Sequence, residues 1–231
     1  MESTDGYSLG GWLEEQDRET CIAIAYRAAL RVFPFVTTND LEAELKERVA
    51  LSTLRAILTS GVASSAQLRT DRKVAKPAYE AAYMVGFKDA TAADAALAAA
   101  FAADGASASY AADAAANAVS HAKEAAGFVD TGNSADMRIG GRSAALLATR
   151  ITRSPALRDL IAERCLSRQN LLDVGGPWSF WRTWYDHAMA GEPLAWDLQL
   201  KVAEIPNSIW EKGAKSVAEA IERCGDAGRR A

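Results

Sequence analysis

The sequence contains few of the residues from which metal and acid–base sites are usually built. It has two histidines and three cysteines in 231 residues. The cysteines, Cys21, Cys165 and Cys224, are far apart in the chain and form no Cys-x-x-Cys pair. This spacing argues against a zinc site or a disulfide framework, and it favours buried thiols in a reducing compartment. We therefore predict no metal and no cofactor.

Long apolar runs and phosphate-binding loops are also missing. Residues 90–126 are apolar by count, but charged side chains interrupt them and alanine contributes little to membrane insertion. The pairs Gly140-Gly141 and Gly175-Gly176 lack the further glycines and the lysine of a phosphate loop. The first residues lack the basic-then-apolar pattern of a signal peptide. We expect a cytoplasmic protein without a membrane span.

The charge of the chain is small overall but unevenly distributed. A formal net charge of −4 argues against nucleic acid as the main partner. The first fifty residues are acidic, whereas residues 138–168, which include Arg158 and Arg164, are rich in arginine. We interpret this asymmetry as an acidic half that packs on a basic half, in the same chain or in a second copy.

The apolar pattern predicts an all-α fold, a compact multi-helix bundle of about nine or ten helices. No segment shows sustained alternation of apolar and polar residues, and alanine, the best helix former, makes up nearly half of residues 77–126. Asp17 is placed to cap a helix that runs to about Phe33, and a second helix is expected to end at Gly61 before a loop over 61–71. In the alanine-rich region, Asp104-Gly105 separates two helices, and Ser107 or Ser109 is a candidate cap for the second.

Five of the six tryptophans lie between residues 178 and 210, which sets the C-terminal part apart. We therefore divide the chain into an alanine-rich helical part, 1–174, and a Trp-rich three-helix unit, 175–231, packed together as one domain. The expected helices are one over 177–190, one that opens at Pro193 and stops at Ile205-Pro206, and a last one that ends at Gly225. A capping box is expected at Ser208 to Glu211, with Trp210 in a short turn and Gly213 as a C-terminal cap.

The same region carries a resemblance. The pattern Trp-x-x-Trp-Tyr from Trp181, followed by Gly-x-Pro from Gly191 and by later tryptophans, looks like the C-terminal segment of a loosely defined bacterial family of alanine-rich helical proteins. The matching positions are Trp181, Trp184, Tyr185, Gly191, Pro193, Trp196, Ile205, Pro206, Trp210 and Gly213, together with the run Arg27-Ala-Ala-Leu-Arg-Val-Phe-Pro34. The resemblance implies a helical fold and no particular activity.

The aromatic stretch has two interpretations. Large aromatic residues bury much apolar area, so a three-helix aromatic core is the simpler one. The other is a binding patch or pocket with His187 nearby as a base, next to Asp186 in sequence. The candidate binding residues are Trp178, Trp181, Trp184, Tyr185 and His187, together with Arg158 and Arg164 for a charged partner.

A polar row around the other histidine is the weakest candidate. Asp113, Asn117, His121 and Glu124 follow one another at helical spacing on one face. Asp113, His121 and Glu124 are residue types that ligate metals, but no second histidine stands at ligand spacing. The simpler interpretation is the solvated face of an amphipathic helix.

Taken together, these features predict a non-enzymatic protein-interaction or adaptor module, which binds another protein or a second copy of itself. The hypothesis rests on the lack of a catalytic constellation, the opposed charges and the aromatic residues near 178–184. Two alternatives stay open. One is a small-molecule-binding protein or enzyme with an aromatic pocket near Trp181, Tyr185 and His187, and the other is a regulator that contacts nucleic acid through residues 138–168.

Overall fold

The computed structural model describes residues 8–36, 42–65, 72–84, 91–105, 107–126, 136–137, 146–149 and 175–229. Over these ranges the chain forms ten α-helices and two 3-10 turns, with no strand. The predicted all-α bundle is confirmed. None of the described helices combines the length and the apolar character needed to cross a membrane.

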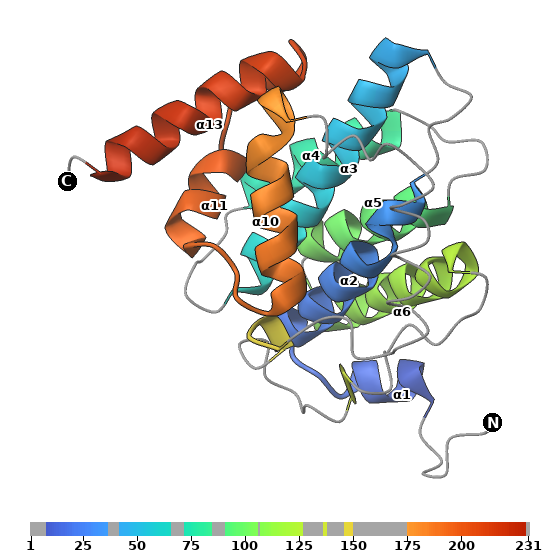
Figure 1. Cartoon of the computed structure of the whole chain (residues 1–231). Coiled ribbons are helices and arrows are strands. Elements are labelled where there is room, and N and C mark those ends of the chain that lie inside the picture. The colour runs from blue at the N-terminus through green and yellow to red at the C-terminus, as the bar shows by residue number, and fades with distance from the viewer. Residues whose placement is uncertain are drawn as a thin grey trace.

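The helices up to the end of the alanine-rich region, residue 126, are α1 (Leu9–Glu14), α2 (Arg18–Val32), α3 (Ala43–Ser64), α4 (Arg72–Met84), α5 (Thr91–Asp104) and α6 (Ala108–Ala125). The 3-10 turn η1 (Phe33–Phe35) follows α2. The C-terminal elements are η3 (Gly176–Trp178), α10 (Ser179–Ala190), α11 (Trp196–Ala203), α12 (Asn207–Trp210) and α13 (Ala214–Arg229). Helices α1 and α13 lie at opposite edges of the molecule, blue and red in Figure 1.

Helix α2 lies at the centre of this arrangement (Figure 1). Asp17 caps it as expected, accepting a hydrogen bond from the Thr20 backbone N–H at 2.7 Å. Every residue from Thr20 to Val32 is buried, because α3, α5 and α6 pack along the helix and α10 contacts it too. A helix that is buried on all sides depends on its neighbours for stability.

The alanine-rich helices pack tightly through their small side chains. Helices α5 and α6 make the most extensive contact in the described fold, and both also pack on α2. Alanines 95, 96, 99, 100, 102 and 103 of α5 and alanines 111, 112, 114, 115, 118 and 122 of α6 are buried. The Ser107 hydroxyl caps α6 as predicted, at 3.2 Å from the Tyr110 backbone nitrogen. Each alanine buries little area, so stability here comes from many close helix contacts.

The C-terminal helices are attached to the rest by specific contacts as well as by one shared hydrophobic cluster. From α10, the Tyr185 hydroxyl donates to the Leu30 carbonyl of α2 at 3.2 Å. From α3, the Glu47 carboxylate accepts the Ala214 backbone N–H at 2.7 Å and so caps the first turn of α13. Gly213, with φ of 91°, makes this possible, because an added Cβ would lie 2.6 Å from the Glu47 carboxylate oxygen.

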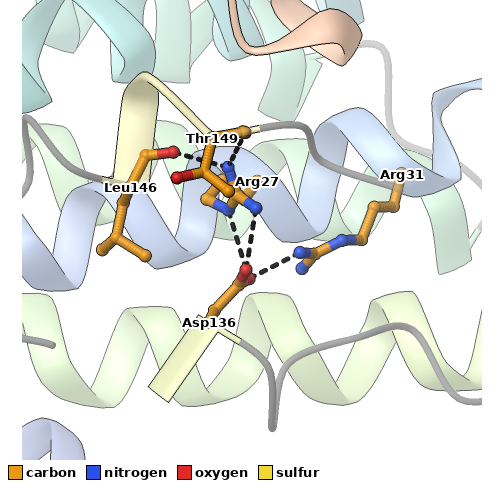
Figure 2. Close-up of polar contacts among 5 residues, drawn as sticks. All are labelled: Arg27, Arg31, Asp136, Leu146 and Thr149. Atoms are coloured by element: carbon orange, nitrogen blue, oxygen red, sulfur yellow. Dashed lines mark hydrogen bonds and ion pairs between the residues drawn. The ribbon is translucent and has the colours of Figure 1, made fainter. Parts of the chain in front are cut away.

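A buried ionic cluster joins α2 to two segments that follow α6 (Figure 2). Arg27 contacts Oδ1 of Asp136 through Nε at 3.0 Å and Nη2 at 2.8 Å, and Arg31 contacts Oδ2 at 2.6 Å. Nη1 of Arg27 also donates to the carbonyls of Leu146, at 2.6 Å, and Thr149, at 2.7 Å. The three charged side chains are each about 1% exposed, so this network is desolvated and the hydrogen bonds must offset that cost.

The end of α3 differs from the sequence-based boundary because of a glycine. Helix α3 continues through Gly61 to Ser64, although the sequence predicts that it ends at Gly61. A Cβ at position 61 would lie 2.8 Å from Cε2 of the buried Tyr26 ring. The glycine therefore admits a neighbouring aromatic ring and does not end the helix.

Other boundaries differ for local reasons. Gly6, Gly10 and Gly11 predict a flexible lead-in over residues 1–11, yet α1 begins at Leu9 with Ser8 as its cap and Leu13 buried. Helix α11 begins at Trp196, not at Pro193, and α12 follows Pro206 without the side-chain capping box expected at Ser208. Helix α13 passes Gly225 and Gly228 and ends at Arg229. Each glycine inside a helix costs only about 1 kcal/mol, which an amphipathic helix tolerates.

Replacing Gly61 with alanine tests this close contact. We expect Gly61→Ala to lower the free energy of unfolding by about 1–3 kcal/mol, because the Tyr26 ring is buried and has little space to move. Urea unfolding followed by circular dichroism measures the change. Gly10→Ala is the matched control, because nothing lies within 4 Å of its added Cβ, and it should leave stability unchanged or raise it. Equal stability of Gly61→Ala and wild type would contradict the packing argument.

The ionic cluster gives a second stability prediction. Asp136→Asn removes the carboxylate that two buried guanidinium groups share, so the free energy of unfolding should fall by about 3–5 kcal/mol. Asp186→Asn removes the partner of Arg182 in an exposed pair at 2.9 Å and should cost less than about 0.5 kcal/mol. Urea titration of the two variants side by side gives both numbers. A small effect at Asp136 would show that the cluster is not needed for stability.

Candidate functional site

Four of the five tryptophans of the C-terminal stretch are buried, and Trp196 is half-buried. Trp178, Trp181 and Trp184 are 5%, 0% and 1% exposed. The rings of Trp181 and Trp184 meet edge to face, with centroids 5.8 Å apart. Nε1 of Trp184 donates to the side-chain oxygen of Gln199 on α11 at 2.9 Å. Of the two interpretations, this burial supports the aromatic core and offers no exposed tryptophan patch for a partner.

Tyr185 and His187 do not come together as a site. The Tyr185 hydroxyl points inward to the Leu30 carbonyl, whereas His187 is exposed and its Nδ1 lies 3.0 Å from the Glu192 carbonyl. The contact between His187 and the Glu192 carbonyl lies at the C-terminal end of α10, where Gly191 forms the cap. Asp186 pairs with Arg182 on the exposed face of the same helix. His187 therefore interacts with the C-terminal end of α10 and not with the buried rings.

The row around His121 forms the solvated face of α6. Asp113 and Glu124 are exposed and His121 is half-buried. Burial raises the pKa of Asp94 on α5, while the nearby His121 lowers it and Glu124 raises it further. In the described ranges no three His, Cys, Asp or Glu side chains gather closely enough to hold a metal ion.

The arginine candidates cannot be placed in the same way. Arg158 and Arg164, and most of the arginine-rich segment 138–168, lie outside the described residues. In the buried ionic cluster the charges are the reverse of those expected from the sequence. The two arginines come from the N-terminal part, which was expected to supply carboxylates, and the carboxylate comes from Asp136. Packing of the acidic half against residues 138–168 stays a prediction.

Four aromatic rings from three helices form a continuous row at the surface. From α4 to α6 the row is Tyr83, Tyr79, Phe101 and Tyr110, with successive centroids 6.0, 5.1 and 4.7 Å apart. We call this set the tyrosine row. Its two ends, Tyr83 and Tyr110, are 62% and 40% exposed, whereas the middle two rings pack against the core. The exposed rings of Tyr83 and Tyr110 therefore rest on two rings that pack against the core.

One acidic side chain, Asp104, acts electrostatically on the tyrosine row. The pKa of the Tyr110 phenol is raised by burial, by Tyr79 and by the nearby carboxylate of Asp104. The row therefore combines ring faces with negative charge, a combination that attracts arginine and lysine side chains.

A separate pocket of about 420 Å³ lies between α3, α4 and the α12 region. We call it the Arg55 pocket. Its lining residues are Glu44, Arg48, Leu51, Ser52, Arg55, Pro77, Glu80, Ala81, Asn207, Trp210, Glu211 and Gly213. Arg55 is 3% exposed, and its guanidinium carbon lies 4.6 Å from the centroid of the Trp210 ring. A pocket of this size accepts a small molecule.

Sequence reasoning missed both features. Tyr79 and Tyr83 share a helix face by their spacing, but no local pattern shows that Phe101 and Tyr110 extend the row. Arg55 stands beside Leu54 and Ile57 in the apolar stripe of α3, and an arginine in such a stripe is the only signal that was present.

Comparison with protein-family models, with curated proteins and with solved structures finds no match for this chain. The resemblance to alanine-rich bacterial helical proteins therefore stays a prediction, and function has to be argued from the geometry alone.

The cysteines give a prediction about reactivity. Burial raises the pKa of the Cys21 thiol to about 11, with a smaller contribution from Asp17, and the thiol donates to the Leu13 carbonyl at 3.4 Å. At neutral pH Cys21 is therefore a thiol and is shielded, whereas Cys224 is half-buried. In a Cys165→Ser background, a thiol reagent should modify Cys224 in the native protein and Cys21 only after unfolding. Rapid native modification of Cys21 would contradict its burial.

Proposed function

We propose that this chain works as a non-enzymatic protein-interaction module and that the tyrosine row is its contact surface. The observation that carries the proposal is the continuity of the row. Tyr83 and Tyr110, two of the three large exposed hydrophobic residues in the described ranges, belong to one chain of ring contacts. Scattered exposed residues need no explanation, whereas tyrosines that cluster on a rigid base are typical of binding hot spots.

The charges beside the row favour a basic partner surface. Guanidinium groups stack on tyrosine faces and also pair with carboxylates such as that of Asp104. The chain itself contains an arginine-rich stretch, residues 138–168, of the required charge. The occupant we propose is therefore a second copy of the chain, bound through that stretch.

The self-association is tested by sedimentation equilibrium at low and high salt. We expect wild type to form a dimer that weakens as salt rises, because charged groups contribute to it. The double change Tyr83→Ser and Tyr110→Ser should raise the dimer dissociation constant at least about tenfold, since loss of one hot-spot side chain costs about 2 kcal/mol or more. Arg158→Glu with Arg164→Glu should have an effect in the same direction.

Leu45→Ser is the matched control for this experiment. Leu45 is 38% exposed on α3 and is not part of the row, so its loss should leave the dissociation constant unchanged. Circular dichroism establishes that all variants are folded. A wild type that stays monomeric at every concentration would rule out a second copy as the partner. The row would then be tested with proteins captured from the native cell, which the double tyrosine variant should lose and Leu45→Ser should keep.

A further inference from the structure

The Arg55 pocket has features of a ligand site that the interaction surface does not explain. Arg55 is held in place on two sides. Its Nη2 donates to the Asn207 side-chain oxygen at 2.6 Å, and its guanidinium lies over the Trp210 ring. Trp210 is fixed in turn, because its Nε1 donates to the Ile205 carbonyl at 2.9 Å. The guanidinium is therefore pre-oriented, which reduces the entropy lost when a ligand binds.

One donor of this buried guanidinium has no partner. The Nε–H of Arg55 is fully shielded and makes no hydrogen bond. In the described part of the chain, no carboxylate lies within 4.0 Å of the group, although Glu211 is near enough to act on it electrostatically. Burial lowers the pKa of Arg55 to about 10, so the group still carries its charge at neutral pH. A buried, charged guanidinium that lines a pocket and is not saturated by hydrogen bonds favours an anionic group in that pocket.

The contrast with Arg27 shows that the chain can saturate a buried guanidinium when the role is structural. Arg27 has a carboxylate and two carbonyls around it. Arg55, buried to nearly the same degree, contacts one amide oxygen and one ring face among the described residues. The two arginines also differ in their surroundings. Arg55 lines the pocket, whereas Arg27 is enclosed in the buried ionic cluster.

The charges around the pocket restrict what the acceptor can be. The lining contains two cations, Arg48 and Arg55, and three carboxylates, Glu44, Glu80 and Glu211. Two positive and three negative charges give the lining a net charge of −1, so a dianion such as phosphate meets repulsion. A carboxylate next to a cationic amine fits better, because each charge finds an opposite partner.

The remaining walls suit a short apolar stem. Leu51, Pro77, Ala81 and the Trp210 ring supply apolar surface within the same pocket. A ligand with a charged end and an apolar body can therefore be bound along its whole length.

We infer that the Arg55 pocket binds a small zwitterion of the amino-acid class. Its carboxylate faces the guanidinium charges of Arg55 and Arg48, and its ammonium group lies toward the glutamates of the pocket. The site is separate from the tyrosine row, so it does not depend on the interaction function proposed above.

Isothermal titration calorimetry with each of the common protein amino acids tests the inference directly. We expect at least one of them to bind saturably. For that amino acid, the analogue without the amine and the analogue without the carboxylate should both bind at least about tenfold more weakly, because each leaves a charge of the pocket unpaired. Inorganic phosphate should not bind. A peptide that ends in the same residue distinguishes a free amino acid from the terminus of a protein as the natural source.

Three variants connect any binding to this pocket. Arg55→Met removes the donor and should weaken binding at least about tenfold. Ser52→Phe leaves Arg55 in place and fills the pocket from the α3 side, so it should also abolish binding even if Arg55→Met fails to fold. Arg182→Gln removes one positive charge at an exposed site, 48% accessible, and serves as the matched control that should bind like wild type.

The outcomes are decisive in both directions. Binding of a zwitterion that both pocket variants lose and Arg182→Gln keeps would establish the site and its ligand class. No binding by any amino acid, binding of phosphate alone, or binding that Ser52→Phe leaves intact would overturn the inference. None of these results depends on the oligomeric state of the chain.

Discussion

The burial of α2 on every side is the constraint on which the rest of the structure depends. A helix without a solvent-facing side can be enclosed only if its neighbours come close, and the alanines of α5 and α6 allow this. The enclosed helix nevertheless carries Arg27 and Arg31, whose charges require a partner inside the protein. Asp136 supplies it, so one carboxylate connects the central helix to the segments that follow the alanine-rich helices.

The all-α class and several caps could be predicted because they depend on local chemistry. Asp17, Ser107 and Gly191 act at helix ends through contacts within a few residues, and each acts as the sequence indicates. Gly61 looks the same in sequence, but its role is set by Tyr26 on another helix, and no local pattern contains that information. Likewise, Trp181 and Trp184 were recognisable as important, whereas only the tertiary structure shows that they are core residues.

The candidate sites were harder to predict because they are assembled from separate helices. In the sequence, Arg55 is a single arginine in an apolar stripe. Only the tertiary structure places Asn207 and Trp210 of α12 against it. The tyrosine row spans α4, α5 and α6, and its neighbouring rings come from positions up to 22 residues apart, 79 to 101. Periodicity identifies one face of one helix, so it cannot detect sites of this kind. Neither histidine lines the Arg55 pocket or belongs to the tyrosine row.

The cap that Glu47 provides to α13 has a consequence for how the molecule is assembled. It joins positions separated by 167 residues, and the neighbouring pocket wall from Asn207 to Gly213 comes from equally late in the chain. During synthesis on the ribosome, α3 and α4 emerge long before the elements that complete this wall. Contacts between such distant residues form slowly, because a long loop must close first. Arg55 therefore leaves the ribosome before the residues that enclose it, and its pocket is complete only once residues 207–213 are in place.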